Sequence, residues 1–150
     1  PSSAHLVQVE VDKDTGEIEI QKYVAVEDCG NVINPMVVEG QILGGIVQGV
    51  GQALYEHGVY DDDGQLVTGS MLDYTMPRAD NFPMIESDRI ETPSPSNSLG
   101  VKGVGEMGSI TSPPAVVNAV VDALSDYGVK HIDMPLTSEK IWNIIQTNGG

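Results

Sequence analysis

One stretch of the chain, residues 36–56, restricts the possible folds more than any other feature of the sequence. Apolar residues recur there mostly at spacings of three and four, the pattern of a buried helix face, and Pro35 stands where a helix can begin. The same stretch contains five glycines, at positions 40, 44, 45, 49 and 51. Because a glycine inside a helix costs up to about 1 kcal/mol relative to alanine, this helix needs a compensating contact. Either another helix packs closely on it, or a ligand lies against its backbone.

The segments around this helix predict an α+β fold, with helices packed on a small mixed or antiparallel sheet. Alternating apolar residues predict a two-stranded hairpin over 6–11 and 18–26, joined by turn residues 12–16. Further along, we expect a short hairpin at 59–67, an irregular segment or one short helix at 69–83, a strand at 84–91, a loop at 92–98, a helix from Pro113 to Leu124, a short strand at 132–134 and a final helix at 137–145. No long linker interrupts the chain, so residues 1–150 are expected to form a single domain.

The charge of the chain excludes some partners. Seven basic and 22 acidic side chains give a net charge of −15, whereas nucleic-acid binding needs clustered Lys and Arg. A salt-adapted surface, or a surface partly covered by a partner, both explain this excess. No run of about 18 apolar residues predicts a membrane span. Residues 1–5 contain neither a basic nor an apolar segment, so we expect no signal peptide. The single cysteine, Cys29, fits a reducing cytoplasmic setting.

The densest candidate for chemistry is the glycine-flanked carboxylate of Glu106, in the stretch 102–108. Glycines on both sides let the backbone approach whatever the carboxylate faces. The apolar neighbours Val104 and Met107 favour a desolvated carboxylate, the environment that suits a general base. Two alternatives remain open from the residues alone: Glu106 is an ordinary turn glutamate, or it forms an ion pair with Lys102.

Two amides on the glycine-rich helix form a second candidate. Gln41 and Gln48 are seven residues apart, so they share one helix face, and they could hydrogen-bond a flat polar ligand. Two surface glutamines would give the same spacing.

Other polar residues carry weaker signals. His5, His57 and His131 are scattered without metal-ligand spacing, so we expect surface or capping histidines and no metal site in this chain. Cys29 is expected to be a half-buried turn residue, since no basic neighbour would activate it. The acidic run 61–64 lacks the downstream glutamate of a calcium loop and is interpreted as a solvated hairpin tip.

Four motifs in order resemble one family. They are DCGNVINP (28–35), EGQILGGIVQGVG (39–51), LDYTMP (72–77) and KGVGE (102–106). Together they resemble the C-terminal part of the molybdopterin-binding large subunit of the xanthine dehydrogenase / aldehyde oxidase / carbon monoxide dehydrogenase family. The resemblance covers nearly the whole chain, from about residue 4 to residue 146.

The resemblance implies a function and a set of site residues. Members of the family are molybdenum hydroxylases, in which a glutamate matching Glu106 acts as general base on a Mo-bound hydroxide. The glutamine matching Gln41 lies beside the molybdopterin, so the glycine-rich helix would pack against the cofactor. Gln48 and the segment Gly103, Val104 and Gly105 are further cofactor contacts on this basis. The resemblance suggests the cytosine dinucleotide form of molybdopterin, and it assigns Asp28 a role in supporting its turn and none in catalysis.

The same resemblance implies partners. The large subunit of the family is several times longer than 150 residues, so the remainder of the large subunit would complete the Mo pocket. Iron–sulfur and flavin subunits or domains would carry the electrons, and the substrate would be a small aldehyde, purine, N-heterocycle or carbon monoxide. The alternative is a non-catalytic domain that keeps the fold and at most binds a partner.

Overall fold

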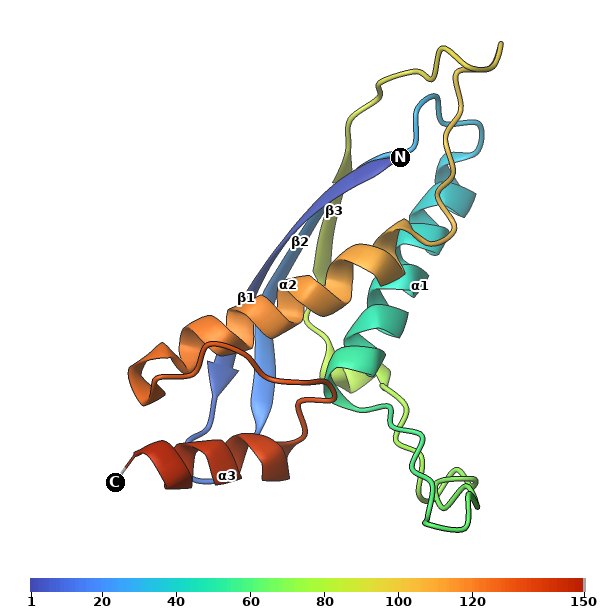
Figure 1. Ribbon diagram of the computed structural model, residues 1–150. Coiled ribbons are helices and arrows are strands. Elements are labelled where there is room, and N and C mark those ends of the chain that lie inside the picture. The colour runs from blue at the N-terminus through green and yellow to red at the C-terminus, as the bar shows by residue number, and fades with distance from the viewer. Residues whose placement is uncertain (150) are drawn as a thin grey trace.

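The computed structural model describes residues 1–149, which form a three-stranded mixed sheet covered by helices (Figure 1). The order β1-β2-β3 places β2 in the centre, antiparallel to β1 and parallel to β3. This arrangement confirms the predicted α+β class. The elements in chain order are β1 (Ser2–Val11), β2 (Ile18–Asp28), α1 (Pro35–Leu54), η1 (Ala79–Asn81), β3 (Ile85–Arg89), α2 (Met107–Ala123), η2 (Ser125–Tyr127) and α3 (Ser138–Asn148).

The hydrophobic core lies between the sheet and the crossing helices α1 and α2. In Figure 1, α2 passes across the sheet and α1 runs beside it, while α3 lies near the turn between β1 and β2. A register shift between Gln8 and Val9 of β1 lets both Ile20 and Tyr23 of β2 face inward. The fully buried apolar residues of the two helices are Ile42, Ile46, Val50 and Ala53 of α1 with Val116 and Val120 of α2.

Four of the five glycines of α1 divide into two groups, and the fifth, Gly51, packs against Glu56 and Pro77. A Cβ on Gly45 would lie 3.1 Å from the Ser109 nitrogen, and a Cβ on Gly49 would collide with Ser112 and Pro113, so α2 occupies the space that side chains would fill. Gly108 of α2 makes the matching close contact with α1: a Cβ on Gly108 would lie 2.6 Å from both the Ile42 oxygen and the Ile46 nitrogen. Gly40 and Gly44 face open space. Close helix packing therefore explains Gly45 and Gly49 and leaves Gly40 and Gly44 unexplained.

The predicted start of α2 is wrong. The helix begins at Met107, six residues before Pro113, and both Pro113 and Pro114 lie inside it. A proline inside a helix removes one backbone hydrogen bond and crowds the preceding turn. Here the first turns pack directly on the α1 backbone through Gly108, and this tertiary contact outweighs the local signal.

Two other short elements differ in outcome. The predicted hairpin at 59–67 is present in a short form, in a segment that projects from the body (Figure 1). Tyr60 and Leu66 form an isolated antiparallel bridge, and the Val67 amide donates to the Val59 carbonyl at 2.9 Å. The predicted strand at 132–134 is wrong: this segment pairs with no strand among residues 1–149. It crosses the core instead, with Ile132 and Leu136 buried and the Leu136 amide donating to the Ala53 carbonyl at 2.7 Å.

The expected surface position of His5 is also wrong. The His5 side chain is fully buried, with Nε2 2.7 Å from Glu27 Oε1 and Nδ1 2.7 Å from the Tyr23 hydroxyl oxygen. Burial raises the pKa of the Tyr23 phenol. The pairing places three polar side chains on the inner sheet face beneath α2. His131, by contrast, is exposed and hydrogen-bonds Asp133, and His57 is exposed.

None of the helices within residues 1–149 combines the length and the apolar character that crossing a bilayer requires.

One glycine at the helix contact, Gly108, and one glycine that faces open space, Gly44, give a matched test of the packing of α1 on α2. We expect Gly108→Ala to lower the free energy of unfolding by about 1–3 kcal/mol, because backbone atoms of α1 occupy the position of the new methyl group. Gly44→Ala is the control and should raise stability by up to about 1 kcal/mol, since its methyl group enters open space and alanine favours the helix. Urea unfolding followed by circular dichroism measures both. Equal effects of the two substitutions would contradict this account of the helix contact.

Candidate functional site

Glu106 stands at the N-cap of α2, in the connection that leads from β3 into this helix. Its side chain is exposed and makes no capping hydrogen bond, while its carbonyl accepts from Ser109 Oγ at 3.0 Å and from the Ile110 amide at 3.1 Å. The expected desolvation by Val104 and Met107 is not present, because both side chains turn toward the core and leave the carboxylate exposed. The carboxylate is thus available to a group outside residues 1–149.

The loop that carries Glu106 is paired with the turn between β2 and α1. Gly30 and Val101 form an antiparallel bridge, and the Lys102 amide donates to the Cys29 carbonyl at 2.7 Å. The Asn31 amide donates to the Gly100 carbonyl at 3.0 Å. Two segments about 70 residues apart in sequence are therefore fixed side by side next to the start of α1.

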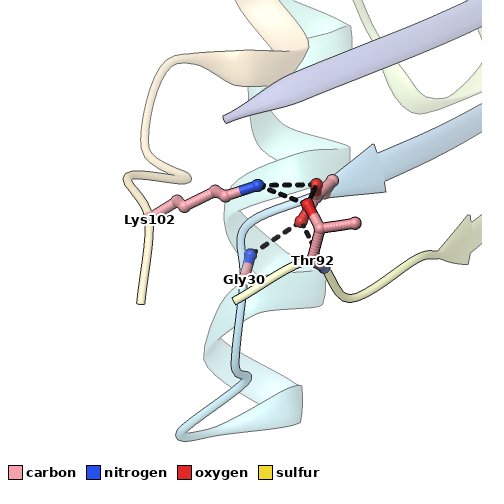
Figure 2. A network of polar contacts seen from close by, with 4 residues as sticks. Gly30, Thr92 and Lys102 are labelled. Carbon is pink, nitrogen blue, oxygen red and sulfur yellow. Dashed lines mark hydrogen bonds and ion pairs between the residues drawn. The ribbon is translucent and has the colours of Figure 1, made fainter. Parts of the chain in front are cut away.

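A polar network around Asp28 reinforces this pairing (Figure 2). Lys102 Nζ lies 2.7 Å from Asp28 Oδ2 and donates to Thr92 Oγ1 at 2.6 Å. Asp28 Oδ1 accepts from the amides of Gly30 at 2.9 Å and Thr92 at 3.2 Å, and the Thr92 hydroxyl donates to Oδ2. The Lys102 ammonium, followed by the Thr92 hydroxyl, holds the pKa of Asp28 well below its usual range. Lys102 thus pairs with Asp28, and the alternative pairing with Glu106 is wrong.

The role predicted for Asp28, support of its own turn, is confirmed by the Gly30 contact. Cys29 is buried more deeply than expected, at 4% exposure. Its side chain lines a cavity of about 210 Å³ together with Val38 and Val104. Val104 therefore belongs to the packing behind the loop, on the side away from exposed Glu106.

The structure brings Gln41 to the loop that carries Glu106. A Cβ on Gly105 would lie 3.7 Å from Gln41 Oε1, so this amide lies directly against the residue that precedes Glu106. Gln48 is exposed two turns further along α1, on the same face. Gly44 lies between the two glutamines and borders open space. Gln41, Gly105 and Glu106 are therefore adjacent, whereas Gln48 is more distant.

These residues fit a flat polar cofactor. Gly40 and Gly44 leave a strip of helix backbone open, with the two amides along one side of it. Within residues 1–149, the backbone amides of Gly103, Val104 and Gly105 donate to no other group, and both glycines are exposed. Free N–H groups in a loop that leads into a helix are suited to anionic and heterocyclic oxygens and nitrogens. Over the same residues, no cluster of three or more His, Cys, Asp or Glu side chains is placed to hold a metal ion.

Sequence reasoning missed Lys102 and Thr92 as partners of Asp28. Lys102 was a candidate only for Glu106, its neighbour in sequence. The true partner lies 74 residues away, and no local pattern marks such a pair.

Known proteins are similar to this chain in sequence and in fold. A family model described as "Molybdopterin cofactor-binding domain" matches residues 1–83. The chain is 49% identical to the nicotine 6-hydroxylase large subunit of Paenarthrobacter nicotinovorans, over 93% of this chain and 17% of that protein. Among solved structures, quinoline 2-oxidoreductase from Pseudomonas putida 86 superposes with a TM-score of 0.89 at 48% identity, over 93% of this chain and 18% of that one. Reconstituted CO dehydrogenase from Oligotropha carboxidovorans gives a TM-score of 0.94 at 35% identity, over 98% and 18%.

The chain spans less than a fifth of the length of each of these proteins. The similarity to them includes the connection that carries Glu106 and the helix that carries Gln41, since it extends over nearly all of residues 1–150.

The Asp28 network generates a pH-dependent stability. Because the folded-state pKa of Asp28 is lowered, its ionised form stabilises the fold at pH values above the unfolded value of about 3.9, and this contribution is lost as the pH falls below that value. We expect Asp28→Asn to be less stable than the original chain at pH 7, with a difference that shrinks below about pH 4. Urea unfolding at several pH values measures it. Asp62→Asn, at the exposed tip of the projecting segment, is the control and should change little. If the difference in the free energy of unfolding stays constant from pH 7 to pH 3, this explanation is wrong.

Proposed function

The chain belongs to the molybdopterin cofactor-binding domain family, as its motifs predicted, and on this premise we propose that it is the C-terminal portion of a molybdenum hydroxylase large subunit. Residues 1–150 form one domain of that subunit, which supplies a general-base glutamate and part of the molybdopterin site. One observation carries the proposal: Gln41 of α1 lies against Gly105, so its amide stands next to the residue that carries the exposed Glu106 carboxylate.

In this proposal the cofactor lies along the open face of α1 and the loop before α2. Gln41 binds it through the side-chain amide, and Gly103 and Gly105 offer backbone N–H groups without steric obstruction. Gln48 contacts its distal part. Val104 contributes its backbone amide, because its side chain is packed against the cavity beside Cys29. The molybdenum and its pterin, taken to be the cytosine dinucleotide form, supply the oxidising centre and the activated oxygen when bound.

Glu106 removes the proton from the oxygen nucleophile. Its carboxylate is exposed, makes no ion pair among residues 1–149 and stands at the N-terminal end of α2, where both oxygens are open to a proton donor. Glu106 stands at a helix end that is held against α1 by the contact at Gly108, so its backbone position is fixed. A general base of this kind contributes about 10²–10⁴-fold to the rate.

The remainder of the large subunit completes the site. Five large apolar side chains lie exposed around the start of α1 and on both sides of Glu106, namely Ile33, Met36, Val37, Leu99 and Ile110. An exposed apolar patch of this kind is typical of an interface. Since the chain spans less than a fifth of the length of these relatives, we propose that the remainder of the large subunit packs on these apolar side chains. Iron–sulfur and flavin subunits or domains are proposed as the electron carriers, and the cytoplasmic location stays a prediction.

The substrate is a small molecule from the four classes of the family: aldehydes, purines, N-heterocycles and carbon monoxide. N-heterocycles are the first class to test, because the relatives named for nicotine and quinoline share 49% and 48% identity with this chain. Retained fold without turnover in the complete protein would favour the non-catalytic alternative.

The role of Glu106 is tested in the complete large subunit assembled with its cofactor. We expect Glu106→Gln to lower kcat by at least about 10²-fold with unchanged molybdenum content, because the amide accepts no proton at neutral pH. Glu19→Gln, an exposed glutamate of β2, is the control. Turnover of the Glu106→Gln enzyme close to that of the original would exclude the general-base role.

The cofactor contact is tested by pterin content. We expect Gln41→Ala to lower the molybdopterin bound per subunit, whereas Gln52→Ala should not. Gln52 is an exposed glutamine of the same helix, about 16 Å further along its axis at 1.5 Å per residue. Acid hydrolysis followed by mass spectrometry should release cytidine monophosphate from the original protein. Equal pterin content in both variants would contradict the contact, and a different nucleotide or none would correct the pterin form.

A further inference from the structure

We propose that Lys102 is a positioning residue for the reaction at Glu106, acting through the ion pair that anchors its loop to Asp28. The inference rests on the proposed role of Glu106. It goes beyond that role because Lys102 lies four residues away, forms no contact with the Glu106 carboxylate among residues 1–149 and faces the interior of the turn.

The anchor joins three segments of the chain at one carboxylate. Asp28 at the end of β2 receives the Lys102 ammonium at 2.7 Å, the Thr92 hydroxyl and amide, and the Gly30 amide (Figure 2). The side chains of Asp28 and Lys102 are 5% and 20% exposed, so solvent screens this pair less than a surface pair. Every lone-pair direction of the Asp28 carboxylate is thereby used.

The segment between the anchor and Glu106 has little support of its own. No atom lies within 4 Å of a Cβ built on Gly103, and only Gln41 Oε1 lies within that distance of one built on Gly105. Both glycines are exposed. The segment is therefore held by Lys102 before it and by the packing of Gly108 on α1 after it, with the Val104 side chain as its one contact with the core between them. Loss of the first end frees the approach to Glu106 while α2 stays in place.

The ion pair is coupled to the backbone contacts beside it. Without the ammonium group, the buried Asp28 carboxylate has no countercharge and its turn must change to reach water or take up a proton. That turn carries the Cys29 carbonyl, which accepts from the Lys102 amide, and the Asn31 amide, which donates to Gly100. A change at Asp28 therefore passes directly into residues 100–102 and from there to Glu106.

The experiment compares four variants of the complete, cofactor-loaded large subunit in its assembled enzyme. Lys102→Met should lower kcat by about 10²-fold with KM changed by less than threefold, which is the scale expected for about 1 Å of misplacement. Lys102→Arg keeps the positive charge and should therefore keep most of the kcat of the original enzyme. Lys22→Met removes an exposed ion pair with Glu86 on the same sheet and should leave turnover unchanged. Glu106→Gln is the reference for loss of the base.

A readout that does not depend on activity accompanies the kinetics. Hydrogen exchange of the amides of residues 31 and 102, which donate to the Gly100 and Cys29 carbonyls in the original protein, should be faster in Lys102→Met, with exchange in α3 unchanged. Molybdenum and pterin content should match the original. If Lys102→Met does not accumulate, Asp28→Asn combined with Lys102→Met removes both charges and should fold, yet still show the loss in kcat and the faster exchange.

The outcomes separate the two proposals. Normal turnover of Lys102→Met with an inactive Glu106→Gln enzyme overturns the positioning role alone. Normal turnover of Glu106→Gln overturns the proposed function and this inference with it. Loss of cofactor from Lys102→Met, or an equal loss in Lys102→Arg, shows a merely structural role and also overturns the inference.

Discussion

The close approach of α1 and α2 is the constraint on which the rest of the structure depends. At Gly45 and Gly108 the backbone of each helix lies where the other would carry a side chain, so the two helices cannot slide without opening a gap or a clash. Glu106 comes two residues before Gly108, and Gln41 comes one turn before Gly45. The crossing point therefore decides that Glu106 and Gln41 lie at the same end of the helix pair.

Local patterns were sufficient where both partners of a contact lie close in sequence. The alternation in β1 and β2, the turn between them and the spacing in α1 each carry their own signal, and these elements were predicted. The start of α2 was not, because Pro113 and Pro114 imitate a helix start while the deciding contact is made with α1. His5 and Lys102 failed for the same reason, since Glu27 and Asp28 lie 22 and 74 residues away from them. The position of Glu106 in a glycine-rich stretch was predictable, but its exposure depends on tertiary packing.

Close helix packing explains some glycines of the glycine-rich helix and leaves others unexplained. Gly45 and Gly49 are required by α2, and no ligand is needed to account for them. A Cβ built on Gly40 or Gly44 would meet nothing within 4 Å, although each glycine costs up to about 1 kcal/mol relative to alanine. The helix thus has one glycine face used by the fold and another that the fold leaves open. Gln41 and Gln48 lie along one side of that second face, and the sequence pattern alone does not separate the two kinds of glycine.

Glu106 differs from the N-cap residues of α1 and α3 in the hydrogen bonds of its side chain. Asn34 of α1 and Thr137 of α3 accept hydrogen bonds from the amides of Val37 and Lys140, as N-cap side chains commonly do. Glu106 of α2 makes no such bond and belongs to no favoured N-cap type. A good cap is worth about 0.5–2 kcal/mol, so α2 begins without a stabilisation that the other two helices have. Packing of Gly108 on α1 offsets that loss, and the carboxylate is left with all of its lone pairs for a group outside the helix. A residue that is fixed in place by others, and whose side chain makes no bond to its own helix, is the arrangement expected of a base that acts on something else.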